Sequence, residues 1–322
     1  MFAFLLAAAS SKVLLQLSEE RSFLSWMRQN NQFYTGDEYH FRLGLFLSHS
    51  RWINEFNKRG NSFKVGHNKF STYTPAEYKA ILGYNSGNIP SNAIKAPIQG
   101  RNRGAPTSWD WREKSVVNGI KDQASCGSCW AFSAITTCES AYAIKTGKLL
   151  RFSEQNIVDC CQACYGCSGG WPNKGIDHVI NNQERKFQLE DDYPYTAVDG
   201  TCVFDADKGV GDVTGYYEVG FFDENDLLDK VYQYGVASVA IQAGTTEFMS
   251  YTGGVFDLPS CSFLFLDHAV AVVGYGVESD GIEYWVVRNS WGTSWGEEGY
   301  IRMSRNKSNQ CGIATQAIVA YV

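Results

Sequence analysis

All ten cysteines of this chain lie after position 125, and the first 125 residues contain none. That density suits disulfide bonds made in an oxidising compartment. Disulfides between distant residues limit the folds a chain can adopt, so the cysteine-bearing part should form a cross-linked body. The same feature separates this body from a long cysteine-free N-terminal part.

The charge divides the chain in a similar place. Residues 1–103 carry 13 Lys and Arg against 6 Asp and Glu, whereas residues 104–322 carry 15 against 28. Such asymmetry indicates either two differently solvated surfaces or a basic segment that docks on an acidic body and loosens when carboxylates are protonated. The acidic body disfavours nucleic acid as a partner, and no apolar run is long enough to span a membrane as a helix.

Two segments mark the boundaries between the parts. Residues 2–11 (FAFLLAAASS) form a short apolar run that ends in small residues, as in a signal peptide, although the start of a buried helix would look similar. Residues 85–104 are rich in Asn, Ser, Gly and Pro, as in an exposed linker that proteases cut. We therefore divide the chain into a signal peptide (1–11), an N-terminal segment with its linker (12–104) and a body (105–322).

Helical and β patterns follow one another along the chain. Residues 19–58 are predicted to be helical, and a second helix should run from Ser128 to about Lys145. Later segments are β-rich and separated by turn residues, at 268–277, 283–288 and 299–303. A helical first half of the body and a β second half predict an α+β fold with two packed lobes and a cleft between them.

The sequence QASCGSCWAFS, residues 123–133, carries the strongest chemical signal. It places Cys129 at the start of the predicted helix, where the helix dipole favours the nucleophilic thiolate. Cys126 and Cys129 also have the spacing of a redox CxxC pair, but Gln123 and Trp130 are not part of that motif. A metal centre is the alternative for the later cluster of cysteines, at 160, 161, 164 and 167.

The segment CGSCW at 126–130 is followed by His268, 139 residues after Cys129, and by Asn289, 160 residues after it. Further segments support the same pattern: SEQNIVDCC, GCSGGWP, DHAVAVVGYG, YWVVRNSWGTSWGEEGYIRM and CGIAT. The chain thus resembles the papain family of cysteine peptidases, and its cathepsin L-like branch in particular. The resemblance implies a papain-like two-lobe fold, with a helical left domain, a β-barrel-like right domain and an α-helical propeptide.

The resemblance also implies a role for each residue of a catalytic set. Cys129 would be the nucleophile, and His268 would deliver a proton to the leaving amine. Asn289 would orient the imidazole, Gln123 would offer its side-chain NH2 to the oxyanion, and Trp291 would cover the His–Asn bond. The chain would hydrolyse peptide bonds through an acyl-enzyme intermediate, with no cofactor and no metal.

The family's disulfide pattern can be carried over by position. It implies the pairs Cys126–Cys167, Cys160–Cys202 and Cys261–Cys311. Cys138 falls on an apolar helix face and would be a buried free thiol. The extra cysteines 161 and 164 are free to bond to each other, which the sequence leaves open.

The N-terminal segment resembles the family's inhibitory propeptide rather than a permanent domain. Its helix motif corresponds to Glu38, Arg42, Phe46, His49, Ile53 and Asn57, where His49 replaces an asparagine. A second motif corresponds to Gly66, Asn68, Phe70 and Thr72, where Thr72 replaces an acid. The loss of that acid leaves His49 and the charge division as candidates for pH-dependent release.

The resemblance places the substrate pocket and its selectivity. Its residues would be Gly169, Gly170, Trp171, Pro172, Ala240, Leu266, Ala269 and Gln316. Apolar walls predict Leu, Val or an aromatic side chain at the substrate position P2, while the two glycines leave backbone edges for an extended substrate. The short segment after Cys160 favours an endopeptidase over a carboxydipeptidase.

We expect a zymogen of the secretory pathway, destined for a lysosome-like compartment or the extracellular space. Expected partners are protein and peptide substrates, the chain's own propeptide and cystatin-like inhibitors, and the enzyme should be a monomer. Asn306-Lys-Ser is a candidate glycan site. The rival interpretations are an inactive family member that serves as a binding protein and a thiol–disulfide exchanger.

Overall fold

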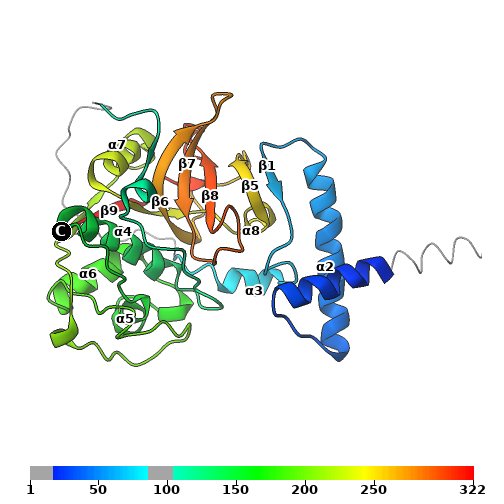
Figure 1. Ribbon diagram of the computed structural model, residues 1–322, viewed down its shortest axis with the longest axis horizontal. Coiled ribbons are helices and arrows are strands. Elements are labelled where there is room, and N and C mark those ends of the chain that lie inside the picture. The colour runs from blue at the N-terminus through cyan, green and yellow to red at the C-terminus, as the bar shows by residue number, and fades with distance from the viewer. Residues whose placement is uncertain (1–16, 86–103) are drawn as a thin grey trace, which may run out of the picture.

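The computed structural model describes residues 17–85 and 104–322. The expected signal peptide, residues 1–11, and most of the expected linker, residues 86–103, lie outside this range. The N-terminal part (17–85) packs against one side of a larger body (104–322) that contains both helices and a sheet (Figure 1). The predicted α+β class is confirmed. Within the described residues, no helix is long and apolar enough to cross a membrane.

The N-terminal part contains two long helices where the sequence predicted one. The first covers residues 17–29 and the second, α2, covers Gly36–Asn57. Asn31 and Gly36 both have left-handed backbone conformations, with φ values of 51° and 57°. Such residues end a helix and turn the chain, which periodicity over a 40-residue window does not reveal.

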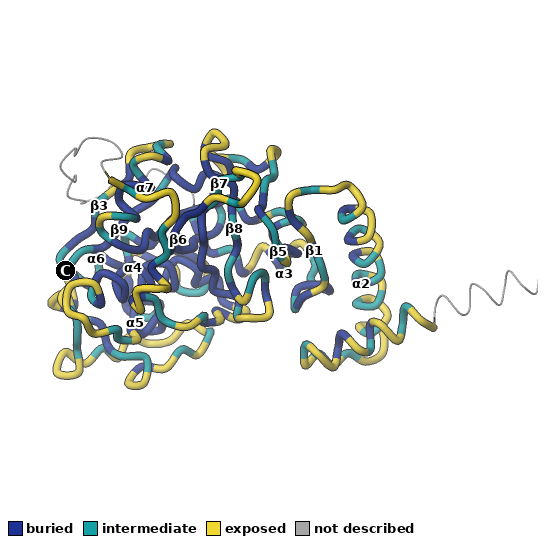
Figure 2. The backbone as a smooth tube through the Cα atoms, turned by 45° about the horizontal axis from the view of Figure 1, so that its top comes forward, coloured by how far each residue is buried: buried dark blue, intermediate teal, exposed yellow. Residues whose placement is uncertain are grey.

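Aromatic packing joins the two N-terminal helices. Phe23 and Trp26 of the first helix lie 5.3 and 5.6 Å from the Phe46 ring of α2. Further along α2 the buried residues are His49, Ile53 and Phe56, each three or four positions from the last. This spacing presents one face of the helix to the interior, while the opposite face stays exposed (Figure 2).

Two short elements attach the N-terminal part to the body. Strand β1, Phe63–Val65, pairs antiparallel with β5, Tyr251–Phe256, and so extends the body's sheet. Helix α3, Pro75–Ala80, begins with a capping box: the Thr74 hydroxyl accepts from the Glu77 N–H, and the Glu77 carboxylate accepts from the Thr74 N–H. The cap fixes the start of α3, after which the chain enters the body.

The helices α4, α5 and α6 form one lobe of the body (Figure 1). The long helix α4 is buried on all sides over most of its length, which explains why its apolar residues are not confined to one face. It ends at Gly147, whose φ of 72° suits glycine. The body's helices are α4 Cys129–Thr146, α5 Glu154–Cys160, α6 Pro172–Asn182, α7 Glu224–Tyr234 and α8 Thr246–Met249, with short 3-10 helices at Trp111–Lys114, Gly166–Ser168, Ala206–Lys208 and Gln310–Gly312.

The other lobe is built on a mixed sheet. Its strand order is β1-β5-β8-β7-β6-β4-β9-β3, with β2 paired to β6. All pairs are antiparallel except β5 with β8. The remaining strands are β2 Trp109–Asp110, β3 Gly215–Glu218, β4 Ala237–Ile241, β6 His268–Val277, β7 Glu283–Arg288, β8 Tyr300–Ser304 and β9 Ala317–Tyr321.

This sheet corrects the expectation of a barrel-like domain. Its path runs from β1 to β3, and among the described residues no pairing joins these two ends. A closed barrel needs every strand to pair on both sides, so the sheet is open. One apolar core lies between this sheet and the N-terminal part, and a second surrounds α4. Helix α4 begins beside the start of β6, where Cys129 and Ala269 belong to the second core.

Candidate active site

The site starts with Cys129, the first residue of α4. Its side chain is completely buried, and Ser128 precedes it as the N-cap residue. The backbone N–H of Ala269 in β6 lies 3.4 Å from the Cys129 sulfur. The helix of one lobe and a strand of the other therefore meet at this thiol.

His268, the first residue of β6, lies next to Ala269 and shares this junction. Its Nε2 atom is 2.8 Å from the Asn289 Oδ1 atom, just beyond the end of β7. The Trp291 ring stacks on the imidazole with 4.8 Å between ring centres, and all three side chains are buried. The other ring nitrogen, Nδ1, has no hydrogen-bond partner among the described residues. The structure thus brings these three sequence-predicted residues together with Cys129.

Gln123 lies on the other side of the thiol, and its amide has partners at both ends. Its Nε2 atom donates to the carbonyl oxygens of Ile81, at 2.8 Å, and of Cys126, at 2.9 Å. Its Oε1 atom accepts a hydrogen bond of 2.6 Å from the Ser290 hydroxyl. The sequence reasoning missed Ser290, although it stands between Asn289 and Trp291 in the motif RNSWG.

The N-terminal part passes along this site at residues 81–85, which follow directly on α3. The Tyr84 N–H donates to the Asp267 carbonyl at 3.1 Å, and the Gly170 N–H donates to the Gly83 carbonyl at 2.9 Å. Tyr84 and Gly170 form a parallel bridge. The predicted backbone edge at Gly170 is thereby occupied by the chain's own N-terminal segment.

Gly83 lies closest to the centre of the site. A Cβ atom placed on Gly83 would come within 1.7 Å of the Gly127 carbonyl oxygen. No side chain fits in that space, so only glycine can pass at this depth. The sequence analysis did not single out Gly83, because one glycine before a linker carries no specific signal.

Tyr84 packs among the residues predicted to form the substrate pocket. Its buried side chain belongs to the apolar cluster that includes Ala240, Leu266 and Ala269, with Trp171 packed against it. The Trp171 indole also donates to the Asn85 carbonyl at 2.5 Å. The other predicted residues lie on neighbouring segments: Gly169 precedes Gly170, Pro172 starts α6, and the Gln316 carbonyl accepts from the Ala240 N–H.

Burial determines the charge of the thiol and the imidazole in this closed arrangement. It raises the pKa of Cys129 to about 12, although hydrogen bonds from the Ala269 and Gly83 N–H groups lower it. Burial also lowers the pKa of His268 to about 4, against the hydrogen bond to Asn289. With the N-terminal segment in place, both groups are neutral around pH 5 to 8, and the thiolate expected at the helix start is disfavoured.

Eight of the ten cysteines are disulfide-bonded. The pairs are Cys126–Cys167, Cys160–Cys202, Cys161–Cys164 and Cys261–Cys311. Cys129 and Cys138 are free and buried. A disulfide at Cys126 leaves Cys129 without the partner that a redox CxxC pair needs, and the four clustered cysteines at 160–167 have no thiolate to offer a metal.

Arg42 links the two motifs of the N-terminal part. Its guanidinium forms ion pairs with Glu38, at 2.7 Å, and Glu77, at 2.5 Å, and it donates to the Thr72 carbonyl. The Arg42 guanidinium holds the pKa of Glu77 at about 2. Glu77, outside both sequence motifs, thus provides a carboxylate near Thr72, the position where the family has an acid.

The remaining motif residues connect α2 to the body. His49 Nε2 is 2.7 Å from the Ser250 hydroxyl, and the Asn68 side chain donates to the Met249 carbonyl. Phe70 lies edge-on to Trp291, with 5.0 Å between ring centres. The N-terminal part is therefore anchored both beside the site and directly on the ring that covers His268.

Comparisons with known proteins agree with this geometry. Residues 105–321 match the model of the papain family of cysteine proteases, and residues 23–78 match that of the cathepsin propeptide inhibitor domain (I29). The chain is 40% identical to digestive cysteine proteinase 2 of Homarus americanus, over 90% of this chain and 91% of that one. It is 38% identical to a cathepsin L-like proteinase of Fasciola hepatica, over 92% of both chains.

A solved structure shows the same arrangement of both parts. The digestive procathepsin L2 proteinase from the larval midgut of Tenebrio molitor superposes with a TM-score of 0.89 at 34% identity, covering 94% of this chain and all of that one. The chain therefore belongs to the papain family of cysteine proteases and carries the family's inhibitory propeptide. It is a cysteine protease made as an inactive precursor, and residues 81–85, which follow the matched inhibitor domain, lie against Asp267 and Gly170 beside the candidate site.

Proposed function

We propose that this protein is a cysteine endopeptidase in which Cys129 attacks the peptide bond and His268 protonates the leaving amine. The observation that carries the proposal is the junction at the start of α4, where the thiol meets β6 next to the hydrogen-bonded pair of His268 and Asn289. Attack by the sulfur on the carbonyl carbon, followed by loss of the protonated amine, leaves an acyl-enzyme that water hydrolyses.

Gln123 supplies the oxyanion donor in this proposal. In the precursor its NH2 group already binds a carbonyl oxygen, that of Ile81. A substrate would present its own carbonyl to the same group once residues 81–85 have left. Donors held in place before the reaction stabilise the developing negative charge without reorganising.

Removal of the propeptide also changes the ionisation of the catalytic pair. Water enters the site and reduces the desolvation that holds the thiol and the imidazole neutral. The dipole of α4 and the imidazolium then favour the thiolate. Covering the site therefore both blocks substrate access and disfavours the reactive thiolate.

We propose a signal peptide at 1–11, and removal of residues 12–104 after secretion or delivery to an acidic, lysosome-like compartment.

The substrate preference follows from the pocket that Tyr84 fills. Its apolar walls, Ala240, Leu266 and Ala269 with Trp171, support a preference for aromatic or branched aliphatic side chains at P2. Gly170 would pair with the substrate backbone as it pairs with the propeptide. The expected partners are protein and peptide substrates and cystatin-like inhibitors. The expected oligomeric state is a monomer.

The inactive binding protein finds no support in relatives that are named proteinases. Labelling with a peptidyl epoxide after acid processing tests the role of Cys129. Wild type and Cys138→Ala should take one label and cleave peptides with an apolar P2 residue, because Cys138 is buried away from the site. Cys129→Ala should do neither. Label or cleavage retained in Cys129→Ala would overturn the assignment.

A further inference from the structure

Five bulky apolar side chains lie exposed together on the body, outside the covered site. We call them the aromatic patch: Phe221, Phe222, Phe263, Leu264 and Phe265. Phe221 is 66% exposed and Phe265 73%. The Phe222 ring lies 3.8 Å from that of Phe221 and 5.3 Å, edge-on, from that of Phe263, measured between ring centres. Single exposed apolar residues are ordinary, whereas a contiguous group of this kind marks an interaction surface.

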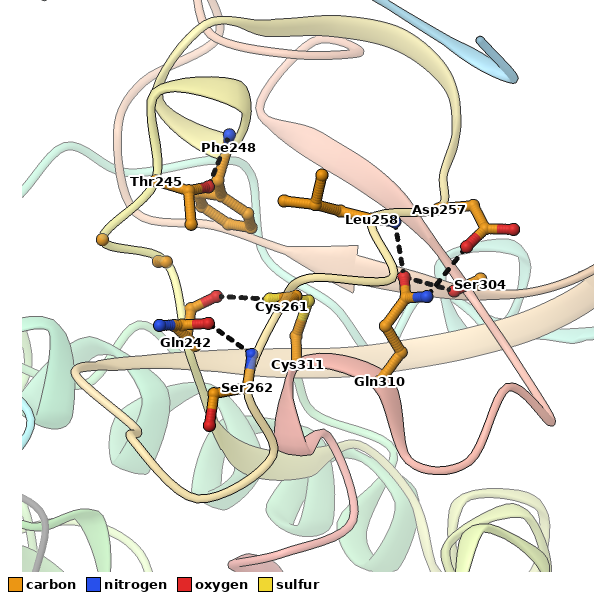
Figure 3. The surroundings of a disulfide bond; sticks show 12 residues. Gln242, Thr245, Phe248, Asp257, Leu258, Cys261, Ser262, Ser304, Gln310 and Cys311 are labelled. Carbon is orange, nitrogen blue, oxygen red and sulfur yellow. Dashed lines mark hydrogen bonds between the residues drawn. A yellow bond between two sulfur atoms is a disulfide. The ribbon is translucent and has the colours of Figure 1, made fainter.

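The loop that carries three of these side chains is held in one conformation. At its base, the Cys261–Cys311 disulfide and a hydrogen bond from the Ser262 N–H to the Gln242 side chain fasten it to the body (Figure 3). The Ser262 hydroxyl accepts from the N–H groups of Leu264 and Phe265, at 3.1 and 3.2 Å. The loop is therefore preorganised, which reduces the entropy lost when a partner binds.

The patch continues the wall of the substrate pocket. Phe265 is followed directly by Leu266, which is buried against Tyr84, and then by Asp267 and His268. The other two patch residues, Phe221 and Phe222, lie on a separate segment. There the Phe222 N–H donates to the carbonyl of Ala314, two residues before Gln316, at 2.9 Å. The patch thus begins where the interface with residues 81–85 ends, and the described N-terminal residues, 17–85, leave it exposed.

We propose that the aromatic patch is a secondary binding surface for polypeptide substrates. It takes apolar side chains that lie N-terminal to the residue held in the Tyr84 pocket. The occupant is a substrate chain because the patch is continuous with the pocket that holds P2, so a chain leaving that pocket over Leu266 meets Phe265 next. This inference rests on the proposed peptidase function and adds a preference for apolar residues beyond P2.

Two fluorogenic peptides with identical residues around the scissile bond test the proposal on acid-processed enzyme. One begins at P2, and the other carries four further N-terminal residues rich in Leu and Phe. For wild type we expect a KM roughly tenfold lower for the longer peptide, which corresponds to about 1.4 kcal/mol of added binding free energy. The variant Phe263→Ser/Leu264→Ser/Phe265→Ser should lose this advantage and keep wild-type kcat and KM on the short peptide.

The matched control replaces two exposed valines, Val198→Ser/Val203→Ser, and should behave as wild type. An advantage that survives in the triple variant, or its absence in wild type, would overturn the proposal. Size-exclusion chromatography tests whether the patch joins copies of the chain instead. That alternative predicts a wild-type dimer, a monomeric triple variant and the same KM advantage in both.

Binding without cleavage separates this proposal from the proposed function. The described residues leave the patch exposed with residues 17–85 in place, so fluorescence anisotropy can follow the longer peptide on the full precursor. Weaker binding to the triple variant than to wild type supports the patch even if no peptide is cleaved. Equal binding to both forms overturns it.

Discussion

At the residue scale, the orientation of one amide group decides how the site can work. The Gln123 Oε1 atom accepts from the Ser290 hydroxyl, so the NH2 end must point the other way, toward the carbonyl that stands over the thiol. The Ser290 hydroxyl binds Gln123, and the Ser290 backbone N–H, which a side-chain substitution leaves in place, donates to the Asn289 Oδ1 atom at 2.8 Å. Ser290 is therefore a positioning residue that acts through Gln123.

The variant Ser290→Ala tests this role. We expect kcat to fall about fivefold with little change in KM, because the loss of one buried hydrogen bond lets the amide turn, at a cost of about 1 kcal/mol. Gln123→Ala should lose on the order of 10² to 10³ in kcat. The double variant should be no slower than Gln123→Ala alone, and additive losses would contradict the coupling.

Gly83 is the residue on which closure of the site depends. Alanine at this position would clash with the Gly127 carbonyl, so residues 81–85 must move away from the thiol. We expect the unprocessed Gly83→Ala precursor to cleave a fluorogenic peptide at neutral pH at least tenfold faster than the wild-type precursor. Gly44→Ala, in open space on α2, is the control and should stay inactive. A silent Gly83→Ala precursor would refute the closure mechanism.

At the element scale, His49 of α2 lies beside His67, which follows β1, and the two form a pair of histidines near the contact with the body. The rings of His49 and His67 lie 5.4 Å apart, and His67 also stacks on Phe46 at 4.1 Å. Serine hydroxyls are the side chains that hydrogen-bond to them: Ser50 and Ser71 to His67, and Ser250 to His49. Protonating both rings would place two positive charges close together in a poorly hydrated interface.

These histidines predict acid-dependent release of the propeptide. Burial lowers the pKa of both, that of His67 to about 4. A histidine whose pKa is lowered in the closed form stabilises that form at pH values above its ordinary pKa near 6.5. This stabilisation is lost as the pH falls toward 4. We expect His49→Asn/His67→Gln to process several-fold more slowly than wild type at pH 4–5, with no difference at pH 7. His40→Gln, exposed on α2, is the control; an unchanged pH profile in the double variant would exclude the pair.

The elements differ in how well the sequence predicted them. Helix α4 and strands β6 and β7 were predicted within a residue of their observed bounds, because an apolar run between glycine or polar turns defines each of them. The two N-terminal helices were merged, since the turn between them is set by single residues at 31 and 36. The extended segment 81–85 could not be predicted, because its conformation depends on partners in the body.

At the scale of the whole molecule, the charge division of the sequence has little counterpart in direct contacts. Among the described residues, the ion pair that joins the two parts is Lys69 with Asp122, at 2.7 Å. The other contacts described here are backbone hydrogen bonds and aromatic packing, such as Phe70 on Trp291. Attachment of the propeptide thus depends mainly on shape and hydrogen bonding.

A buried charge cluster gives the whole body a preference for acid. The Lys121 ammonium lies 2.8 Å from Glu154, 3.1 Å from Glu190 and 3.6 Å from Glu139. The Arg151 guanidinium also pairs with the partly exposed Glu190, at 2.9 Å, which leaves Lys121 to compensate the two fully buried carboxylates, Glu139 and Glu154. Burial accordingly raises the pKa of Glu154 to about 7, although the Lys121 ammonium lowers it.

A carboxyl whose pKa is raised on folding stabilises the folded form while it is protonated. That stabilisation is complete below about pH 4.5 and is lost as pH rises toward 7. We expect the melting temperature to fall by roughly 5 °C between pH 5 and pH 7. Glu154→Gln should flatten this dependence, and the exposed control Glu113→Gln should retain it. Calorimetry across this range is the measurement, and an equally steep curve for Glu154→Gln would exclude this carboxyl.

The sequence alone determined the class of protein, because nucleophile, histidine, asparagine and propeptide motifs are local patterns of residue type and spacing. It also placed α4 and the strands that carry His268 and Asn289. Only the tertiary structure decided that Gly83 passes against Gly127 and Tyr84 packs with Leu266 and Ala269, that Ser290 binds Gln123, that the sheet stays open and that Phe263 to Phe265 lie exposed beside Leu266. The physical reason is that burial and hydrogen bonding between residues far apart in the chain exist only once the chain has folded.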